Sequence, residues 1–289
     1  MADGTVAVLV RLARPKGTVL LLGAPLTGYG FAHWDYALPP TRPLALALVL
    51  VAWLALSAGS LWLNAALDGD EGGALFAARA PRPRGLTTYA YAALAVAVAF
   101  AVAADRVAGL ACGAAAALAV LYSHPRTMWK ASPVLGPLVN VLGYGVLSWL
   151  AGWAVVRVSM SAATSAAMVL LSVFVLGMTF AAQAFQRDDD ARRGYRTLVV
   201  THGPEACLRA ASACARVAVA GVAVLAAAGV YPRLCLLGIP AFLGAERVMA
   251  RWRAAPDGGA PADAARYALS MLAGGVTLMA LAYLDVFLP

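Results

Sequence analysis

Two clusters of acidic side chains, each preceded by a carboxamide, are the residues of this sequence best suited to carry chemistry. They hold six of the fourteen acidic residues of the chain: Asp68, Asp70, Glu71, Asp188, Asp189 and Asp190. Asn64 lies four residues before Asp68, and Gln186 lies four before Asp190, so each pair shares a helix face if its helix continues. Carboxylate and amide oxygens are hard ligands of the kind that Mg²⁺ accepts, usually together with phosphate oxygens.

Arginine residues follow both clusters and bear on what the clusters bind. Arg84 comes after the first cluster, and Arg192 and Arg193 come soon after the second. A run of charges is most often a solvated loop, and this is the plainest interpretation of either cluster taken alone. Carboxylates this close repel one another, however, unless a cation or a basic group offsets them. Carboxylates beside guanidinium groups suit a site that holds magnesium and a diphosphate together.

Long uncharged segments must position these clusters. The chain has 289 residues, of which 62% are hydrophobic and 12% charged, whereas a soluble domain carries about 25% charged residues. Five uncharged runs are near or above the roughly 18–20 residues that cross a bilayer as helix: 43–67, 85–104, 131–156, 158–186 and 267–284. Shorter or interrupted candidates are 17–34, 107–125, 207–230 and 231–249. We therefore predict an all-α, polytopic membrane protein with about nine transmembrane helices, in which residues 1–289 form a single membrane-embedded domain.

The basic residues of the chain are distributed unevenly between the two sides of this nine-helix arrangement. Sixteen share one side: Arg11, Arg14, Lys16, Arg79, Arg82, Arg84, Arg126, Lys130, Arg187, Arg192, Arg193, Arg196, Arg247, Arg251, Arg253 and Arg266. The other side holds four: Arg42, Arg106, Arg157 and Arg233. Such an excess marks the cytoplasmic side, so we expect a multi-pass protein of the cell membrane with its N-terminus and both acidic clusters in the cytoplasm. The lipid bilayer therefore explains the net charge of +8 better than nucleic acid does.

Taken together, these features resemble the UbiA superfamily of membrane prenyltransferases over nearly the whole chain. That family has about nine helices, an NxxxDxxxD motif after the second helix and a DxxxD motif after the sixth. Similar stretches here are "LARPKGTVLLLGAPLTGY", "LYSHPRTMWK", "GPLVNVLGYGVLSWLAGWA" and "RRGYRTL". The resemblance implies a helical bundle with a central cavity open to the cytoplasmic side, a Mg²⁺ cofactor and an isoprenoid diphosphate substrate.

The first acidic cluster departs from the family's motif at one position. Asn64 and Asp68 match the opening of that motif. The acid expected four residues further on falls on Gly72, so that Asp70 or Glu71 would have to take its place.

The second cluster also lacks one acid of the family's motif. Asp190 matches the later acid, judged from its distance to Gly194, and the earlier acid falls on Gln186. The resemblance still implies a set of carboxylates that bind the metal: Asp68, Asp70, Glu71, Asp188 and Asp190.

Further site residues are implied for the loop after the fourth span and for the fifth span. Tyr122, Ser123 and Lys130 are similar to the tyrosine and lysine that contact diphosphate in this family, although a lone lysine at a helix boundary is often a snorkelling anchor. Asn140 and Tyr144 would face the pocket, and hydrogen bonding between helices explains a buried Asn nearly as well. The remaining expected substrate contacts are Asn64, Arg84, Gln186 and Arg193. The expected catalytic residues are Asp68, Lys130 and Asp190.

These expectations lead to three functions. The leading one is Mg²⁺-dependent transfer of a prenyl group to an aromatic or lipid-like acceptor inside the membrane. A second keeps the same ionisation of the diphosphate but cyclises the resulting cation to a terpene. The third is a non-catalytic membrane binding protein, which Gly72 and Gln186 favour because they stand where the family has acids. The acidic motif of phosphatidyl-transfer enzymes is absent from the sequence, which disfavours that class.

Overall fold

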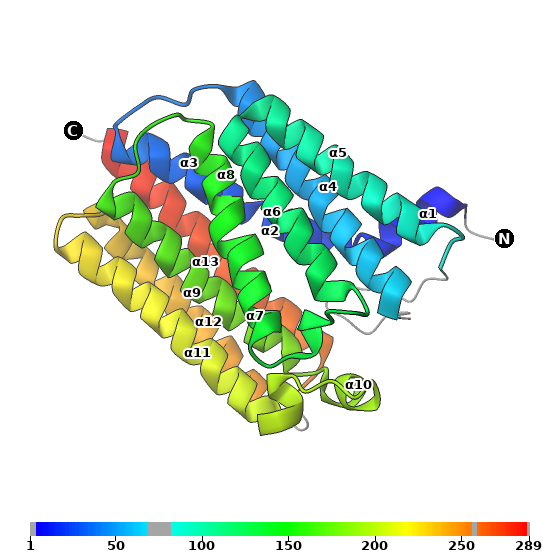
Figure 1. Cartoon of the computed structure of the whole chain (residues 1–289). Coiled ribbons are helices and arrows are strands. Elements are labelled where there is room, and N and C mark those ends of the chain that lie inside the picture. Colours follow the sequence, from blue (N-terminus) through cyan, green and yellow to red (C-terminus); the bar gives the residue numbers. More distant parts are fainter. Residues whose placement is uncertain (1–3, 69–81, 256–258, 288–289) are drawn as a thin grey trace.

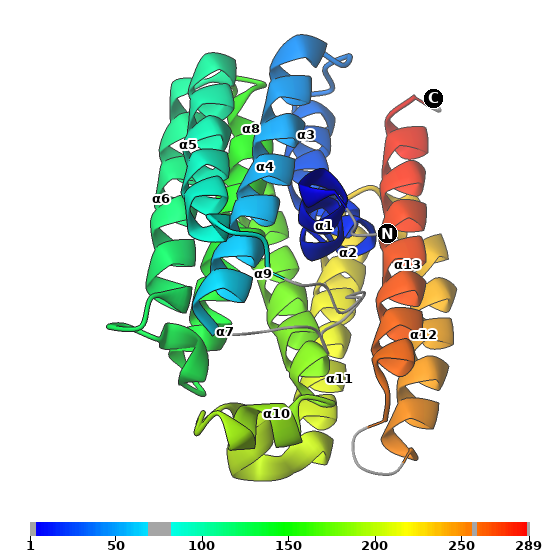
Figure 2. The same ribbon diagram turned by 90° about the vertical axis from the view of Figure 1, so that its right-hand side faces the viewer.

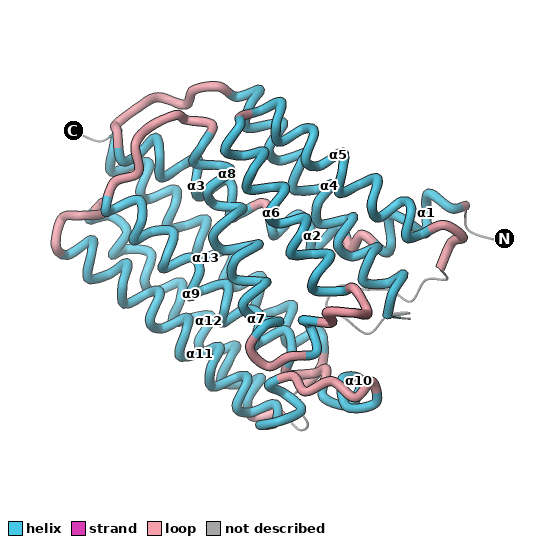
Figure 3. The backbone as a smooth tube through the Cα atoms, in the orientation of Figure 1, coloured by secondary structure: helices cyan, strands magenta, loops and turns pink. Residues whose placement is uncertain are grey.

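The protein is a bundle of helices that run across one another at shallow angles (Figures 1 and 3). The computed structural model describes residues 4–68, 82–255 and 259–287, and these residues form helices and connecting segments without a strand. The elements are α1 (Thr5–Leu12), α2 (Pro15–Leu21), α3 (Gly23–Asp35), α4 (Pro43–Asp68), α5 (Leu86–Ala104), α6 (Arg106–Ser123), η1 (Trp129–Ala131), α7 (Leu135–Asn140), η2 (Val141–Leu147), α8 (Ser148–Ala154), α9 (Ala162–Gln183), α10 (Arg187–Arg192), α11 (Leu198–Ala227), η3 (Arg233–Gly238), α12 (Ile239–Arg253) and α13 (Pro261–Phe287).

Seven helices of the described part of the chain are long and apolar enough to cross a membrane by length and composition. They are Pro43–Leu67, Leu86–Ala104, Arg106–Ser123, Leu135–Ala154, Ala162–Gln183, Leu198–Ala227 and Pro261–Ala282. The prediction of an all-α membrane protein is therefore confirmed, whereas the count of nine spans is not.

The two expected spans at 17–34 and 231–249 are assembled from shorter helices instead. In the first, α2 ends at Leu21 and α3 begins at Gly23, where glycine weakens helix continuation. In the second, the 3-10 turn η3 precedes α12, whose first turn contains Pro240. Proline has no N–H to donate and is tolerated only in the first turn of a helix, so it starts a new helix here.

Small residues allow the helices to approach closely. On α5 the buried stripe Ala90, Leu94, Ala97 and Ala101 follows helical spacing and packs in the same apolar core as α4 and α6. Where α3 crosses α8, a side chain on Gly152 would lie 1.8 Å from the carbonyl oxygen of Pro25, so only glycine fits there. Membrane helices associate through such close backbone contacts because lipid gives them no hydrophobic driving force.

The end of α4, where the first acidic cluster begins, and α10, which carries the second, lie at one end of the bundle. Figure 2 shows α10, the end of α4 and the turn between α6 and α7 together at this end, with the last turns of α3 and α13 at the other. Helices α4 and α6 run in the same direction, and the Ser123 hydroxyl donates a hydrogen bond of 3.3 Å to Asn64 Oδ1 near their ends. The residues one and two turns before Asn64 and Ser123 therefore lie at matching depths.

The opposite end of the bundle is closed by internal polar contacts. Asp105 caps α6 through the Val107 N–H at 2.9 Å and forms ion pairs with Arg157 at 3.3 Å and Arg42 at 3.8 Å. His33 is fully buried, and its two ring nitrogens lie 2.8 Å from the Tyr29 carbonyl oxygen and 3.0 Å from Thr41 Oγ1. These contacts join α3, α4, α6 and the end of α8.

Candidate functional site

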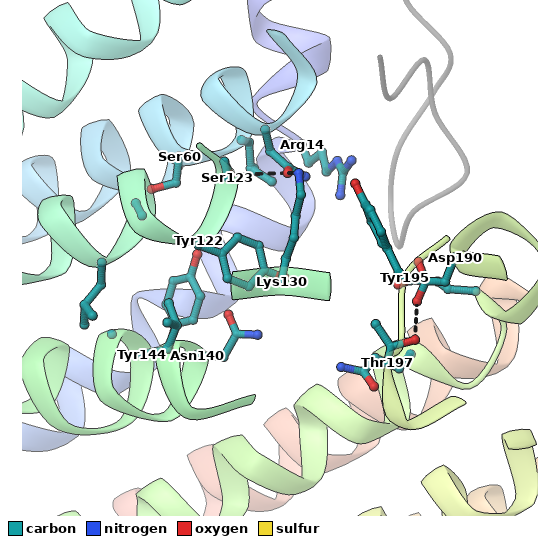
Figure 4. A pocket seen from close by; sticks show the side chains of 18 of the residues that line it. Arg14, Ser60, Tyr122, Ser123, Lys130, Asn140, Tyr144, Asp190, Tyr195 and Thr197 are labelled. Carbon is teal, nitrogen blue, oxygen red and sulfur yellow. Dashed lines mark hydrogen bonds between the residues drawn. The ribbon is translucent and has the colours of Figure 1, made fainter. Parts of the chain in front are cut away.

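A cavity of about 260 Å³ lies between the C-terminal half of α4 and the segment that contains α10 (Figure 4). Its walls come from α4, α6, α7, η2, the end of α9, and the segment that contains α10. Most of the residues predicted for the site line it: Asn64, Tyr122, Ser123, Lys130, Asn140, Tyr144, Gln186, Asp190 and Arg193. Predicted residues as far apart in the sequence as Asn64 and Arg193 are thus brought to one chamber by the fold.

Lys130 projects into this chamber from the 3-10 turn η1. The turn follows Met128, whose backbone is left-handed with φ of 47°, and Gly136 packs against the backbone of Lys130 from the other side. The ammonium group donates a hydrogen bond of 2.8 Å to Asn64 Oδ1, and the residue is only 6% exposed. Burial, together with the nearby Arg193, lowers the pKa of Lys130 to about 7, and Asp190 opposes this shift. A cation held among such groups is suited to binding an anion.

Asp190 faces the same chamber from the short helix α10. It is 7% exposed, and its Oδ2 accepts a hydrogen bond of 2.7 Å from the Thr197 hydroxyl. Its backbone carbonyl accepts the Tyr195 N–H at 2.9 Å, and its own N–H donates to the Gln186 carbonyl at 2.9 Å. Asp190 is therefore fixed at the cavity through both its backbone and its carboxylate.

Contacts between two loops bring Lys130 and Asp190 into one site. The Arg196 N–H donates to the Ala131 carbonyl at 2.9 Å, which joins the turn after α6 to the segment after α10. The Lys130 ammonium lies 5.9 Å from the centre of the Tyr195 ring, within the range of a cation–π interaction. Figure 4 shows Lys130 reaching between Ser123 and Tyr195 into the chamber.

The inner wall carries tyrosine rings and carboxamides. Tyr122 on α6, and Asn140 and Tyr144 on α7 and η2, lie next to one another in Figure 4. The η2 segment is a π-helix, a form that is rare and is found most often at functional sites. Gln183, at the end of α9, adds a buried amide oxygen that has no hydrogen-bond partner among the described residues.

Some predicted residues lie away from the cavity or outside the described chain. Asp188 is exposed and does not line the cavity, whereas its neighbour Asp189 does. Arg84 is exposed near the start of α5 and is also not a lining residue. Asp70 and Glu71 lie outside the described residues, and for Asp68 the structure describes the backbone as the last residue of α4 but not the side chain.

Several lining residues were not among the predicted site residues: Arg14, Ser60, Gln183, Asp189, Tyr195 and Thr197. Arg14 comes from the junction of α1 and α2, where its φ is 50°, a left-handed conformation that is uncommon for a residue with a side chain. Hydrogen bonds from the Thr18 hydroxyl to the Ala13 carbonyl, at 2.6 Å, and from the Thr18 N–H to the Arg14 carbonyl, at 3.0 Å, hold this junction. The Arg–Pro step within the first quoted stretch was the available signal for a break in the helix there.

The sequence profile of the UbiA prenyltransferase family matches residues 19–270. This covers most of the chain, including α4, the cavity-lining helices and α10. The chain belongs to the UbiA prenyltransferase family. The resemblance inferred from the acidic clusters is therefore confirmed. No curated protein matches the chain significantly.

Solved structures share the UbiA fold with this chain. A UbiA homologue from Archaeoglobus fulgidus bound to GPP and Mg²⁺ has a TM-score of 0.74 at 19% identity, covering 97% of this chain and 100% of that one. The same homologue bound to DMAPP and Mg²⁺ has a TM-score of 0.70 at 19% identity, covering 94% and 99%. An apo UbiA homologue from Aeropyrum pernix K1 has a TM-score of 0.66 at 17% identity, covering 93% and 98%.

The donor groups at the cavity fit a magnesium ion that is shared with a substrate. Mg²⁺ in such sites takes one or two carboxylates together with phosphate oxygens and water. Asp189 and Asp190 supply carboxylates at the cavity, and Gln183 supplies an unpartnered amide oxygen. Within the described part of the chain, three or more His, Cys, Asp or Glu side chains do not gather to form a complete protein-only metal site.

Proposed function

We propose that this protein catalyses the Mg²⁺-dependent transfer of a prenyl group from an isoprenoid diphosphate to a hydrophobic or aromatic acceptor within the membrane. The observation that carries the proposal is that the buried Lys130 cation and the buried Asp190 carboxylate face one cavity whose deeper walls carry aliphatic side chains and tyrosine rings beside two carboxamides. The A. fulgidus homologue, bound to GPP and Mg²⁺ or to DMAPP and Mg²⁺, supports the same pairing of ligand and metal.

The polar mouth of the cavity would hold the diphosphate. Lys130, Arg193 and Arg14 line this region and would neutralise phosphate oxygens. Asp190 and Asp189, with Asp68, would hold Mg²⁺, which when bound stabilises negative charge on the departing diphosphate. Fixed positive charge aimed at the leaving group costs no reorganisation as the bond breaks, so it acts selectively on the transition state.

The reaction would proceed by loss of diphosphate and capture of the carbon fragment. The bond between the allylic carbon and the bridging oxygen breaks, and its electron pair stays with the diphosphate. Tyr122 and Tyr144 line the inner wall and would shelter the allylic cation with their π faces. The nucleophilic atom of the acceptor then forms the new bond to carbon, and an acceptor proton leaves.

The charge distribution supports an assignment of the side of the membrane. The end of the bundle that carries α10 and Lys130 is the end toward which the excess of basic residues was assigned. We propose that this end faces the cytoplasm, with the N-terminus on the same side.

The test is Mg²⁺-dependent release of diphosphate from prenyl diphosphates of several lengths by the purified protein in lipid, with and without an aromatic acid as acceptor. Transfer predicts diphosphate release together with a prenylated acceptor. A cyclic terpene formed without acceptor would identify the cyclase alternative. Magnesium-dependent binding without release at any length would overturn the proposal in favour of a non-catalytic binding protein, for which Gln186 at the position of a motif acid is the argument.

A further inference from the structure

The cavity has a measurable depth along two helices that run side by side in the same direction. On α4 the lining residues Leu56, Ser60 and Asn64 are spaced by four, and on α6 Ala115, Ala119 and Ser123 have the same spacing. The hydrogen bond between Ser123 and Asn64 fixes the relative height of the two helices. Leu56 and Ala115 therefore lie at one level, each eight residues from the polar mouth.

The cavity ends at this level against packed side chains. Leu56 and Ala115 are 5% and 7% exposed, and both belong to the apolar core of α4, α5, α6 and α8. Beyond them the next turns place Trp53 on α4 and Cys112 on α6, which are fully buried in the same core and do not line the cavity. Trp53 is among the largest fully buried side chains of the protein. Leu56 and Ala115 are thus the floor of the cavity.

The α4 and α6 sides of the channel between mouth and floor present apolar surface. The Ser60 hydroxyl donates to the Leu56 carbonyl of its own helix at 2.7 Å, so its hydrogen-bonding capacity is used within α4. The other lining residues of these two helices at intermediate depth are Leu61, Leu118 and Ala119. A hydrocarbon chain entering from the mouth would meet no charged side chain of α4 or α6 before the floor.

The depth corresponds to a short prenyl chain. Eight residues of α-helix rise about 12 Å. Three backbone bonds of an extended chain advance about 3.6 Å at most, so the four main-chain bonds of one isoprene unit advance about 5 Å by the same geometry. About two isoprene units therefore fit between the phosphate level at Asn64 and the floor at Leu56.

We infer that the floor formed by Leu56 and Ala115 restricts this protein to short allylic diphosphates, with the two-unit geranyl chain as the preferred donor. This inference rests on the proposed function, because it assigns the donor of that same site. The walls at these two positions, rather than the polar mouth, set the length that is accepted.

The first experiment compares dimethylallyl, geranyl, farnesyl and geranylgeranyl diphosphate by kcat/KM for diphosphate release in lipid. We expect geranyl to exceed farnesyl and geranylgeranyl by about 10- to 200-fold, the range by which an apolar pocket rejects a surplus methylene or more. Equal values for geranyl and the longer chains, or values that rise with length, would overturn the inference.

Three substitutions on α4 and α6 test the floor, one by making the cavity deeper and two by making it shallower. Leu56→Ala deepens the cavity and should raise the farnesyl-to-geranyl ratio by about tenfold or more. Ala115→Leu, and Ala119→Leu one turn nearer the mouth, shorten the cavity and should lower kcat/KM for geranyl while sparing dimethylallyl. The matched controls are Val51→Ala on α4 and Ala114→Leu on α6, which change the same kinds of residue on exposed faces and should leave the ratios unchanged.

A binding measurement separates this inference from the proposed function. Thiolodiphosphate analogues of the four donors, with sulfur as the bridging atom, ionise slowly and report affinity without turnover. If no diphosphate is released from any donor but the geranyl analogue binds most tightly and Leu56→Ala shifts that preference to farnesyl, the transfer function fails and the length restriction stands. If the substitutions at positions 56, 115 and 119 leave the order of affinities unchanged, the length restriction fails whatever the activity.

Discussion

The two ends of the helix bundle use the same kinds of residue in opposite ways. At the closed end, the carboxylate of Asp105 meets two arginines and a helix N-terminus, and Asp35 accepts the Thr164 hydroxyl at 2.7 Å. At the cavity end, Lys130 is buried against a neutral amide oxygen, with its pKa lowered to about 7, and the Gln183 amide oxygen has no partner. The closed end pairs its carboxylates with groups of the protein, whereas the cavity end leaves part of its polar capacity for a ligand.

This difference has an energetic meaning. A buried polar group without a hydrogen bond costs stability, and a desolvated charge costs more. A ligand that binds only the folded state restores stability by mass action. We therefore expect substitutions at the closed end to reduce stability with little effect on activity, and substitutions at the cavity end to do the reverse.

The largest difference between an effect on activity and an effect on stability should come from comparing Asp190→Ala with Asp105→Ala. Loss of the Asp190 carboxylate should reduce the rate of diphosphate release by at least about 10²–10³-fold, the usual effect of removing one preorganised electrostatic group. Asp105→Ala should instead lower the free energy of unfolding by about 1–2 kcal/mol through the lost cap alone, with kcat/KM within a few-fold of the parent protein. Release assays and thermal unfolding in the same detergent measure both. Full activity in Asp190→Ala would sink the assignment of this carboxylate.

The next largest effect is expected at Lys130, where kcat/KM for diphosphate release should depend on pH. The ammonium form, present below a pKa of about 7, attracts the diphosphate anion, so kcat/KM should fall as pH rises above about 7. This fall is at most tenfold per pH unit, because binding to the neutral lysine takes up one proton. It ends at the pKa of Lys130 in the complex, which the bound anion raises above the pKa in the free protein. Lys130→Arg should remove this fall since guanidinium stays charged. Lys130→Met should give a flat profile, with kcat/KM about 10²-fold below the parent protein below pH 7 and a difference that shrinks as the pH rises. A parent profile that is flat from pH 6 to 9 would contradict the role of Lys130.

The sequence predicted the class of fold for a physical reason, whereas most residues of the chamber were predicted from the resemblance to the UbiA superfamily. Long uncharged runs admit few structures in a bilayer, and polar residues near the ends of such runs must find shared surroundings. It was harder to predict which side chains of α10 face the cavity. In the triplet of aspartates, the first turn of α10 begins at Arg187, so Asp189, Asp190 and Arg193 face the cavity while Asp188 does not. Three identical residues in a row do not indicate which of them face the cavity.

Contacts that depend on tertiary structure were not predicted from the sequence. Arg14 lines the cavity from the junction of α1 and α2, where its backbone is left-handed. Tyr195 and Thr197 gain their positions from hydrogen bonds to Asp190, which close a loop of five to seven residues. The interrupted spans at 17–34 and 231–249 contain Gly and Pro at the breaks, a signal that hydropathy averages conceal.

A closer comparison of the two ends uses two threonines that donate to carboxylates at the same distance of 2.7 Å, Thr197 to Asp190 and Thr164 to Asp35. Valine has nearly the same shape but no hydroxyl. Thr197→Val should weaken the orientation of Asp190 and raise the Mg²⁺ concentration needed for half-maximal release by about tenfold, as loss of an outer-shell partner does. Thr164→Val should leave the Mg²⁺ dependence unchanged and lower the free energy of unfolding by about 1 kcal/mol. Equal effects of the two substitutions on Mg²⁺ dependence would break the comparison.

The smallest effect should come from Gln183, and its sign is informative. Gln183→Met keeps the length of the side chain and removes the amide oxygen that has no partner. Because that oxygen is desolvated without a hydrogen bond, its loss should raise the free energy of unfolding by about 1 kcal/mol, while activity falls a few-fold if the oxygen serves the ligand. Thr179→Val is the matched control on α9, since the Thr179 hydroxyl already bonds the Val175 carbonyl of its own helix at 3.0 Å, and it should change neither quantity. A Gln183→Met protein that is less stable yet fully active would show that the unpaired oxygen belongs to the packing of α9, and the contrast between the two ends would then rest on the charged residues alone.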